Sequence, residues 1–172
     1  MAPRRGGADE HVQAHPGDGT PDMSTYRLER RQVVSRPLEQ AFAFYEQPRN
    51  LCRITPRWLQ FRMVSGEALS MRRGLRIHYR IRPLGVPQRW TSEITEYDPP
   101  YRFVDEQVRG PYRRWRHIHE FRPVGDATEI VDVVEYEMPF GWLGRLAHAL
   151  IVGRQLRSIF DYRQKVVAEL MR

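Results

Sequence analysis

The stretch GPYRRWRHIHEFRPVGDATEIVDVVEY (residues 110–136) spaces Trp115, His117, His119 and Phe121 at two-residue intervals. Residues two apart on a β-strand point to the same face, so both imidazoles and both aromatic rings share one side. A Gly-Asp pair then marks a tight turn into a second alternating run. The stretch therefore predicts a β-hairpin whose inner face mixes aromatic and polar side chains.

Counting residues from the turns predicts which side chains lie opposite one another on neighbouring strands. A two-residue loop after the histidine strand places His119 opposite Asp132, and a three-residue turn before it places His117 opposite Asp105. We therefore expect two separate His–Asp pairs, each joining a different pair of strands. The side chains expected on the inner face of the sheet are Tyr79, Trp90, Ser92, Phe103, Asp105, Gln107, Trp115, His117, His119, Phe121, Ile130, Asp132, Val134 and Tyr136.

Turn signals divide the ordered chain into a first strand, two short helices, six further strands and one long helix. The first strand is expected at residues 26–34, and the short helices within 35–47 and 48–56. The further strands are expected at about 58–65, 74–82, 88–97, 101–109, 113–122 and 127–137. An antiparallel sheet covered by one amphipathic helix is an α+β fold.

The long helix is expected at residues 142–171, packed on the inner face of the sheet. Its inward side chains are expected to be Leu146, Leu150, Leu156, Ile159, Val166 and Leu170. A strongly curved sheet that grips a single helix leaves a cavity, because one helix cannot fill the concavity. Small-molecule pockets usually measure about 300–1,000 Å³, so a void of less than a few hundred cubic ångströms would contradict the binding hypothesis.

The 172 residues fit one domain, with a disordered extension at residues 1–23 and a folded domain at 24–172. The extension has too few large apolar residues to offset the entropy lost on ordering. Cys52 is the only cysteine, which excludes an internal disulfide and fits a reducing compartment. We therefore expect a cytoplasmic protein, and no apolar run approaches the roughly 20 residues of a membrane span.

The formal net charge of +7 raises the question of nucleic-acid binding. Nearly all of the cations are arginines, and they alternate along the strands, as Arg114 and Arg116 do. Alternation of this kind is typical of the solvated face of a strand and not of a clustered basic patch. Nucleic acid is therefore the third hypothesis and not the first.

FVDEQVRGPYRRWRHIHEF (residues 103–121), followed by GDATEIVDVVEYEMPFG (residues 125–141), resembles the SRPBCC superfamily of START-like helix-grip ligand-binding proteins, in its bacterial stand-alone branch. The resemblance spans about residues 26–167. It implies a seven-stranded antiparallel curved sheet around a long C-terminal helix, with two short helices between strands 1 and 2 and a deep hydrophobic cavity. Relatives bind lipids, sterols, quinones or polyketides, and some are polyketide cyclases or dehydratases.

Binding of a hydrophobic or amphipathic small molecule, such as a lipid, quinone or polyketide, is the first hypothesis. The expected walls of the site are Tyr79, Trp90, Phe103 and Trp115, and the expected contacts to the polar end of the ligand are Asp105, Gln107, His117, His119, Asp132 and Tyr136. The alternative is a cyclase- or dehydratase-like enzyme, because a His–Asp pair in an apolar cavity can move protons. Its candidate catalytic residues are His117, His119, Asp105 and Asp132.

Two histidines and a carboxylate on one strand face also resemble a metal-binding triad. Each histidine is expected to have its own aspartate, however, so we expect neither a metal nor another cofactor. Phe140 and the apolar run at residues 146–152 predict a transient membrane contact or a contact with a second subunit. Both a monomer and a homodimer are compatible with the sequence.

Overall fold

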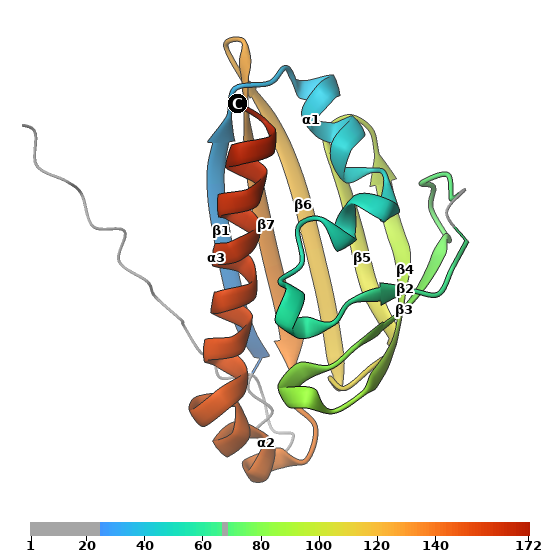
Figure 1. Cartoon of the computed structure of the whole chain (residues 1–172), viewed down its shortest axis with the longest axis vertical. Coiled ribbons are helices and arrows are strands. Elements are labelled where there is room, and N and C mark those ends of the chain that lie inside the picture. Colours follow the sequence, from blue (N-terminus) through green and yellow to red (C-terminus); the bar gives the residue numbers. More distant parts are fainter. Residues whose placement is uncertain (1–24, 67–68) are drawn as a thin grey trace, which may run out of the picture.

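One curved antiparallel sheet of seven strands forms the frame of the computed structural model, which describes residues 25–66 and 69–172 (Figure 1). The strands lie in the order β1-β7-β6-β5-β4-β3-β2. Their bounds are β1 Thr25–Val34, β2 Arg62–Met63, β3 Arg76–Ile81, β4 Gln88–Asp98, β5 Arg102–Arg109, β6 Arg114–Val124 and β7 Ala127–Glu137. The extension predicted at residues 1–23 lies outside the described residues.

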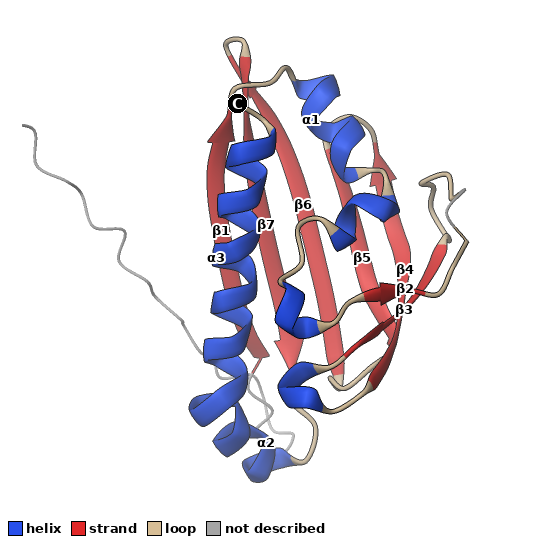
Figure 2. Cartoon of the chain, in the orientation of Figure 1, coloured by secondary structure: helices blue, strands red, loops and turns tan. Residues whose placement is uncertain are grey.

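All helices lie on one face of the sheet (Figure 2). Between β1 and β2 the chain forms α1 (Leu38–Tyr45) and the 3₁₀ turns η1 (Pro48–Cys52) and η2 (Arg57–Leu59), and a third turn, η3 (Pro83–Gly85), joins β3 to β4. The strand predicted at residues 58–65 is wrong over most of its length. The reason is local, because η2 follows Pro56 and ends at Gln60, whose left-handed φ of 47° breaks the extended backbone.

The predicted register of the central hairpins is confirmed. His119 pairs with Asp132 across β6 and β7, and His117 pairs with Asp105 across β5 and β6. The β6–β7 loop has the predicted two residues, with Gly125 at a φ of +59° that favours glycine. Register shifts between β4 and β5 produce bulges without changing which face carries Asp105.

The C-terminal helical segment consists of α2 (Gly141–Ala147), a π-helical turn (His148–Val152) and α3 (Gly153–Leu170). α3 lies along the β1 and β7 side of the sheet, whereas α2 lies beyond its end (Figure 1). The prediction that Leu146, Leu150 and Leu170 face inward is wrong, since all three are exposed. A π-helical turn contains extra backbone per turn and shifts the phase of the apolar stripe. The buried residues of this last segment are Leu156, Phe160, Arg163, Val167 and Met171.

Candidate functional site

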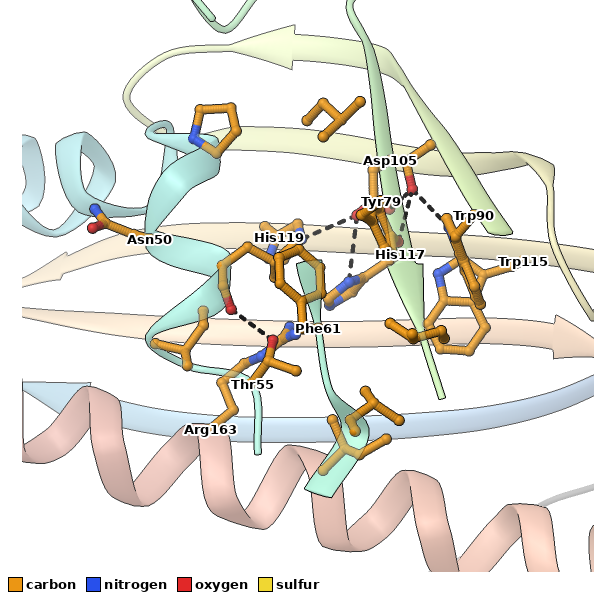
Figure 3. Close-up of a pocket in the computed structure, with 18 of the residues that line it drawn as sticks. Asn50, Thr55, Phe61, Tyr79, Trp90, Asp105, Trp115, His117, His119 and Arg163 are labelled. Atoms are coloured by element: carbon orange, nitrogen blue, oxygen red, sulfur yellow. Dashed lines mark hydrogen bonds and ion pairs between the residues drawn. The ribbon is translucent and has the colours of Figure 1, made fainter. Parts of the chain in front are cut away.

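A cavity of about 170 Å³ lies between the concave face of the sheet and α3. Leu156 and Ile159 line it from the helix, and Leu51 lines it from η1. Most of its wall is apolar, and its polar groups include a cluster on β5 and β6 and the separate side chains of Asn50, Thr55 and Arg163 (Figure 3). Of the predicted site residues, this lining contains Tyr79, Trp90, Phe103, Asp105, Trp115, His117 and His119.

Two histidines and two aspartates form a single buried cluster on this wall. The Nδ1 and Nε2 atoms of His117 lie 3.4 Å from Asp105 Oδ2 and 3.2 Å from Asp132 Oδ1. The Nε2 and Nδ1 atoms of His119 lie 3.3 Å from Asp105 Oδ2 and 2.8 Å from Asp132 Oδ1. Only two of these contacts have the geometry of hydrogen bonds, His117 Nε2 with Asp132 Oδ1 and His119 Nε2 with Asp105 Oδ2. The expectation of two separate pairs is therefore wrong. Each imidazole ring carries two nitrogens on different sides of the ring, and these contact aspartates on both neighbouring strands.

Electrostatics in the cluster favour ionised carboxylates. Burial alone would raise the pKa of Asp105 and of Asp132, but close contacts with both histidines outweigh it and hold each pKa well below the usual range. Burial lowers the pKa of His119, but its contacts with the two carboxylates dominate and raise it. The cavity wall therefore presents an imidazole that readily carries a proton between two anionic partners.

Ser92 connects this cluster to the aromatic wall. Its hydroxyl donates to Asp105 Oδ1 at 3.0 Å and accepts from Trp90 Nε1 at 3.0 Å. The hydroxyl of Tyr79 lies 3.4 Å from the same oxygen of Ser92. Figure 3 shows these side chains gathered beside the histidines. A bonded network of this kind fixes the Asp105 carboxylate and leaves its position little freedom.

Three of the predicted site residues lie outside the lining of the cavity. Gln107 closes the β5–β6 turn, since its amide nitrogen donates to the Tyr112 carbonyl at 2.7 Å. The hydroxyl of Tyr136, near the end of β7, lies 2.8 Å from His148 Nε2. Asp132 is buried behind the two histidines and acts through them.

Arg163 and Tyr45 line the cavity and were not predicted. Arg163 is only 7% exposed although it lies on α3, and its guanidinium lies 4.8 Å from the Phe160 ring centroid. A charged residue in an amphipathic helix is normally assigned to solvent, which is why it was missed. Its spacing contains the signal, since it lies seven residues after Leu156 and four before Val167 on the buried stripe.

Asp105, His117 and His119 have ligand atoms within 4.8 Å of one another and could approach one metal ion. All four imidazole nitrogens already face carboxylate oxygens, however. A metal could bind these histidines only by displacing a carboxylate oxygen from each of them. In established metal sites, one nitrogen of each histidine binds the metal and only the other one holds a partner such as a carboxylate. The geometry fits a proton-sharing cluster better than an open metal site.

The sheet, the gripped helix and the cavity between them define a helix-grip protein with a ligand-binding cavity fold. A family model described as "Polyketide cyclase / dehydrase and lipid transport" matches residues 34–160. The chain belongs to this family, in agreement with the resemblance seen in its sequence. A comparison with curated protein sequences found no match.

Solved structures show the same fold at low sequence identity. TTHA0849 from Thermus thermophilus has 20% identity and a TM-score of 0.64, covering 83% of this chain and 94% of its own. The major latex-like protein 151 of Panax ginseng has 12% identity and a TM-score of 0.63, with 86% and 97% covered. A norcoclaurine synthase point mutant from Thalictrum flavum, bound to a transition-state analogue, has 15% identity and a TM-score of 0.61, with 86% and 97% covered. These likenesses establish the fold alone.

Proposed function

We propose that the protein binds a compact amphipathic small molecule in the cavity between the sheet and α3. The observation that carries this proposal is a largely apolar cavity with a buried His–Asp cluster on one wall. Apolar walls provide binding energy through desolvation, and a few convergent polar groups orient the ligand. His117, His119 and Asp105 are the groups that meet the polar end of the ligand.

The size of the cavity restricts the ligand. At about 170 Å³ the cavity is below the few hundred cubic ångströms that the hypothesis drawn from the sequence required for ligand binding, so binding of a ligand of ordinary size is contradicted and only a smaller ligand is proposed. Small-molecule pockets usually reach about 300–1,000 Å³, and a cavity of about 150 Å³ holds one benzene ring. A ligand of roughly one aromatic ring fits, whereas a complete lipid or sterol does not fit this conformation. A complete lipid is therefore not proposed as the ligand of this cavity.

Proton-transfer catalysis of the cyclase or dehydratase type is the second candidate. It is favoured by the raised pKa of His119, which results from contacts with Asp105 and Asp132 that outweigh the effect of burial. It is disfavoured by the pairing of every imidazole nitrogen with a carboxylate, which leaves no free base directed into the cavity. Binding without turnover is the simpler function of this arrangement.

Nucleic-acid binding is the least favoured candidate, because several arginines of the outer face are paired with glutamates, although Arg62, Arg80 and Arg89 lie opposite one another on β2, β3 and β4 with no glutamate between them. Arg116 lies within 2.8 to 3.8 Å of three glutamates, and Arg76 lies 2.7 Å from Glu93. A phosphate backbone would have to compete with these carboxylates.

Cys52 is exposed and free, and a cytoplasmic location remains a proposal from the sequence.

We assign transient membrane contact to the α2 surface, which comprises the exposed side chains of Phe140, Trp142, Leu143, Leu146, Leu150 and Ile151. Phe140 is 81% and Trp142 is 66% exposed. Arg154, exposed at the start of α3, supplies a positive charge beside these apolar groups. Apolar side chains next to cations are typical of segments that lie in the interface of anionic bilayers. None of the described helices is long and apolar enough to cross a bilayer.

Filling the cavity tests the binding proposal. Ile159 lines the cavity from α3 and is partly buried, so Ile159→Trp should occupy the void without opening the core. Ser158→Trp places the same ring on the exposed face of the same helix and is the matched control. Native mass spectrometry of protein purified from cells should detect a bound small molecule in the wild type and in the control, but not in Ile159→Trp. Equal occupancy in all three proteins would remove the cavity as the binding site.

A further inference from the structure

Arg163 is a buried cation without an acidic partner. It projects from α3 toward the sheet, and its guanidinium end approaches Thr55 (Figure 3). Within residues 25–66 and 69–172 no carboxylate lies at ion-pair distance from it, and its Nε has no hydrogen-bond partner. The Thr55 hydroxyl is already engaged, since it donates to the Leu51 carbonyl at 2.6 Å.

Burial of an unpaired guanidinium costs free energy. An arginine does not lose its proton, so burial cannot be relieved by neutralisation. Removing an ion from water costs several kcal/mol even after relaxation of its surroundings. The contact with Phe160 offsets part of this cost but supplies no hydrogen-bond acceptor. The described part of the chain therefore supplies no anion for the guanidinium of Arg163.

A second unpartnered donor lines the same cavity. The hydroxyl of Tyr45 is buried and, among the described residues, has no hydrogen-bond partner. Burial and the Asp132 charge raise the pKa of Tyr45, so the hydroxyl stays protonated and available as a donor, while the nearby Arg163 charge and the Gln32 amide oppose that rise. Arg163 and Tyr45 thus place buried N–H and O–H groups in the lining of one cavity, and the described part of the protein provides no acceptor for the Arg163 Nε or the Tyr45 hydroxyl.

We propose that Arg163 anchors the carboxylate of the ligand, with Tyr45 as a supporting donor, so that the protein selects compact one-ring or short-chain monocarboxylic acids. The inference rests on the proposed binding function and adds the chemical class of the ligand. A carboxylate matches the planar fork of a guanidinium and takes two parallel hydrogen bonds. The small volume and the apolar wall disfavour a phosphate, whose larger charge would need more donors.

Calorimetric titration with matched acids and neutral analogues tests the inference. Benzoate and phenylacetate should bind the wild-type protein, and benzamide and benzyl alcohol should bind at least about tenfold more weakly, as expected for a lost charge-assisted hydrogen bond. Arg163→Met preserves the length of the side chain and should reduce the affinity for the acids by a similar factor. Lys165→Met removes an exposed cation from the same helix and should leave these affinities unchanged.

The outcomes separate the two proposals. Equal affinity for acids and neutral analogues, or unchanged affinity for acids in Arg163→Met, would overturn the carboxylate anchor and leave cavity binding in place. Absence of binding in both series of compounds would overturn the inference and count against the binding function as well. If Arg163→Met does not fold, the comparison of benzoate with benzamide on the wild-type protein still decides the question.

Discussion

The protonation of His119 is set by two opposing effects. Burial disfavours its charged form, whereas contacts with Asp105 and Asp132 favour that form and raise its pKa above 6.5. The two carboxylates shift in the other direction, because their contacts with the histidines outweigh the effect of burial. Each partner thus stabilises the charge of the other within a part of the protein that excludes water.

These shifts predict the pH dependence of stability. A raised pKa in the folded state gives a stabilisation that is complete below 6.5 and is lost as the pH rises through the folded pKa of His119. The lowered pKa values of the aspartates give a stabilisation that is present above 3.8 and is lost as the pH falls through their folded values. The cluster should therefore stabilise the fold most between these two limits.

His119→Gln should lower the free energy of unfolding most below pH 6.5, and the difference from wild type should shrink as the pH rises. Urea denaturation of both proteins at several pH values below and above 6.5 measures this difference in the free energy of unfolding. The comparison with wild type is needed because His148, whose pKa is lowered by burial and by Arg157, contributes with the opposite sign. His78→Gln, an exposed substitution on the outer face, should preserve the wild-type profile. A difference that does not change with pH would mean that His119 carries no extra proton in the folded state.

The β6–β7 hairpin holds three of the four cluster residues in register through its turn. Gly125 has a φ of +59°, and a Cβ added there would meet no atom within 4 Å. The cost of a side chain at this position is therefore backbone strain alone, about 1–2 kcal/mol for an L-residue in the left-handed region.

Gly125→Ala should lower the free energy of unfolding by about 1 kcal/mol, since only this strain opposes it. Gly66→Ala is the control, because Gly66 also has open space around it but no positive φ. That substitution should be neutral or slightly stabilising, by up to about 1 kcal/mol, through the unfolded chain. Chemical denaturation of the two variants measures both values. A neutral Gly125→Ala would indicate that the loop relaxes to another turn type.

The sheet could be predicted from the sequence because turns and two-residue alternation are local signals. Register then followed by counting, and it placed His117 and His119 opposite the correct aspartates. The cross-contacts within the cluster could not be counted, since the register of a strand does not determine how an imidazole rotates. The π-helical turn and the buried Arg163 were missed for a related reason, because both depend on packing between α3 and the sheet.

The distribution of charge over the whole molecule separates its surfaces by function. On the outer face of the sheet, arginines alternate with glutamates and pair with them, as Arg102 does with Glu96 and Arg122 with Glu120. Exposed ion pairs contribute little to stability, at most about 1 kcal/mol each. Their effect is to offset the positive charge of this face on β4 to β7.

The proposed membrane contact of the α2 surface leads to a measurable expectation. Trp142→Gln should reduce cosedimentation with vesicles that contain phosphatidylserine, because the indole supplies much of the buried apolar area. Trp58→Gln removes another exposed tryptophan, on η2, and should leave cosedimentation unchanged. Binding to the anionic vesicles should weaken with added salt, since part of the attraction comes from Arg154. If light scattering instead shows a dimer that Trp142→Gln dissociates, and the vesicles bind no protein, the α2 surface is a contact between two copies of the chain and not a membrane contact.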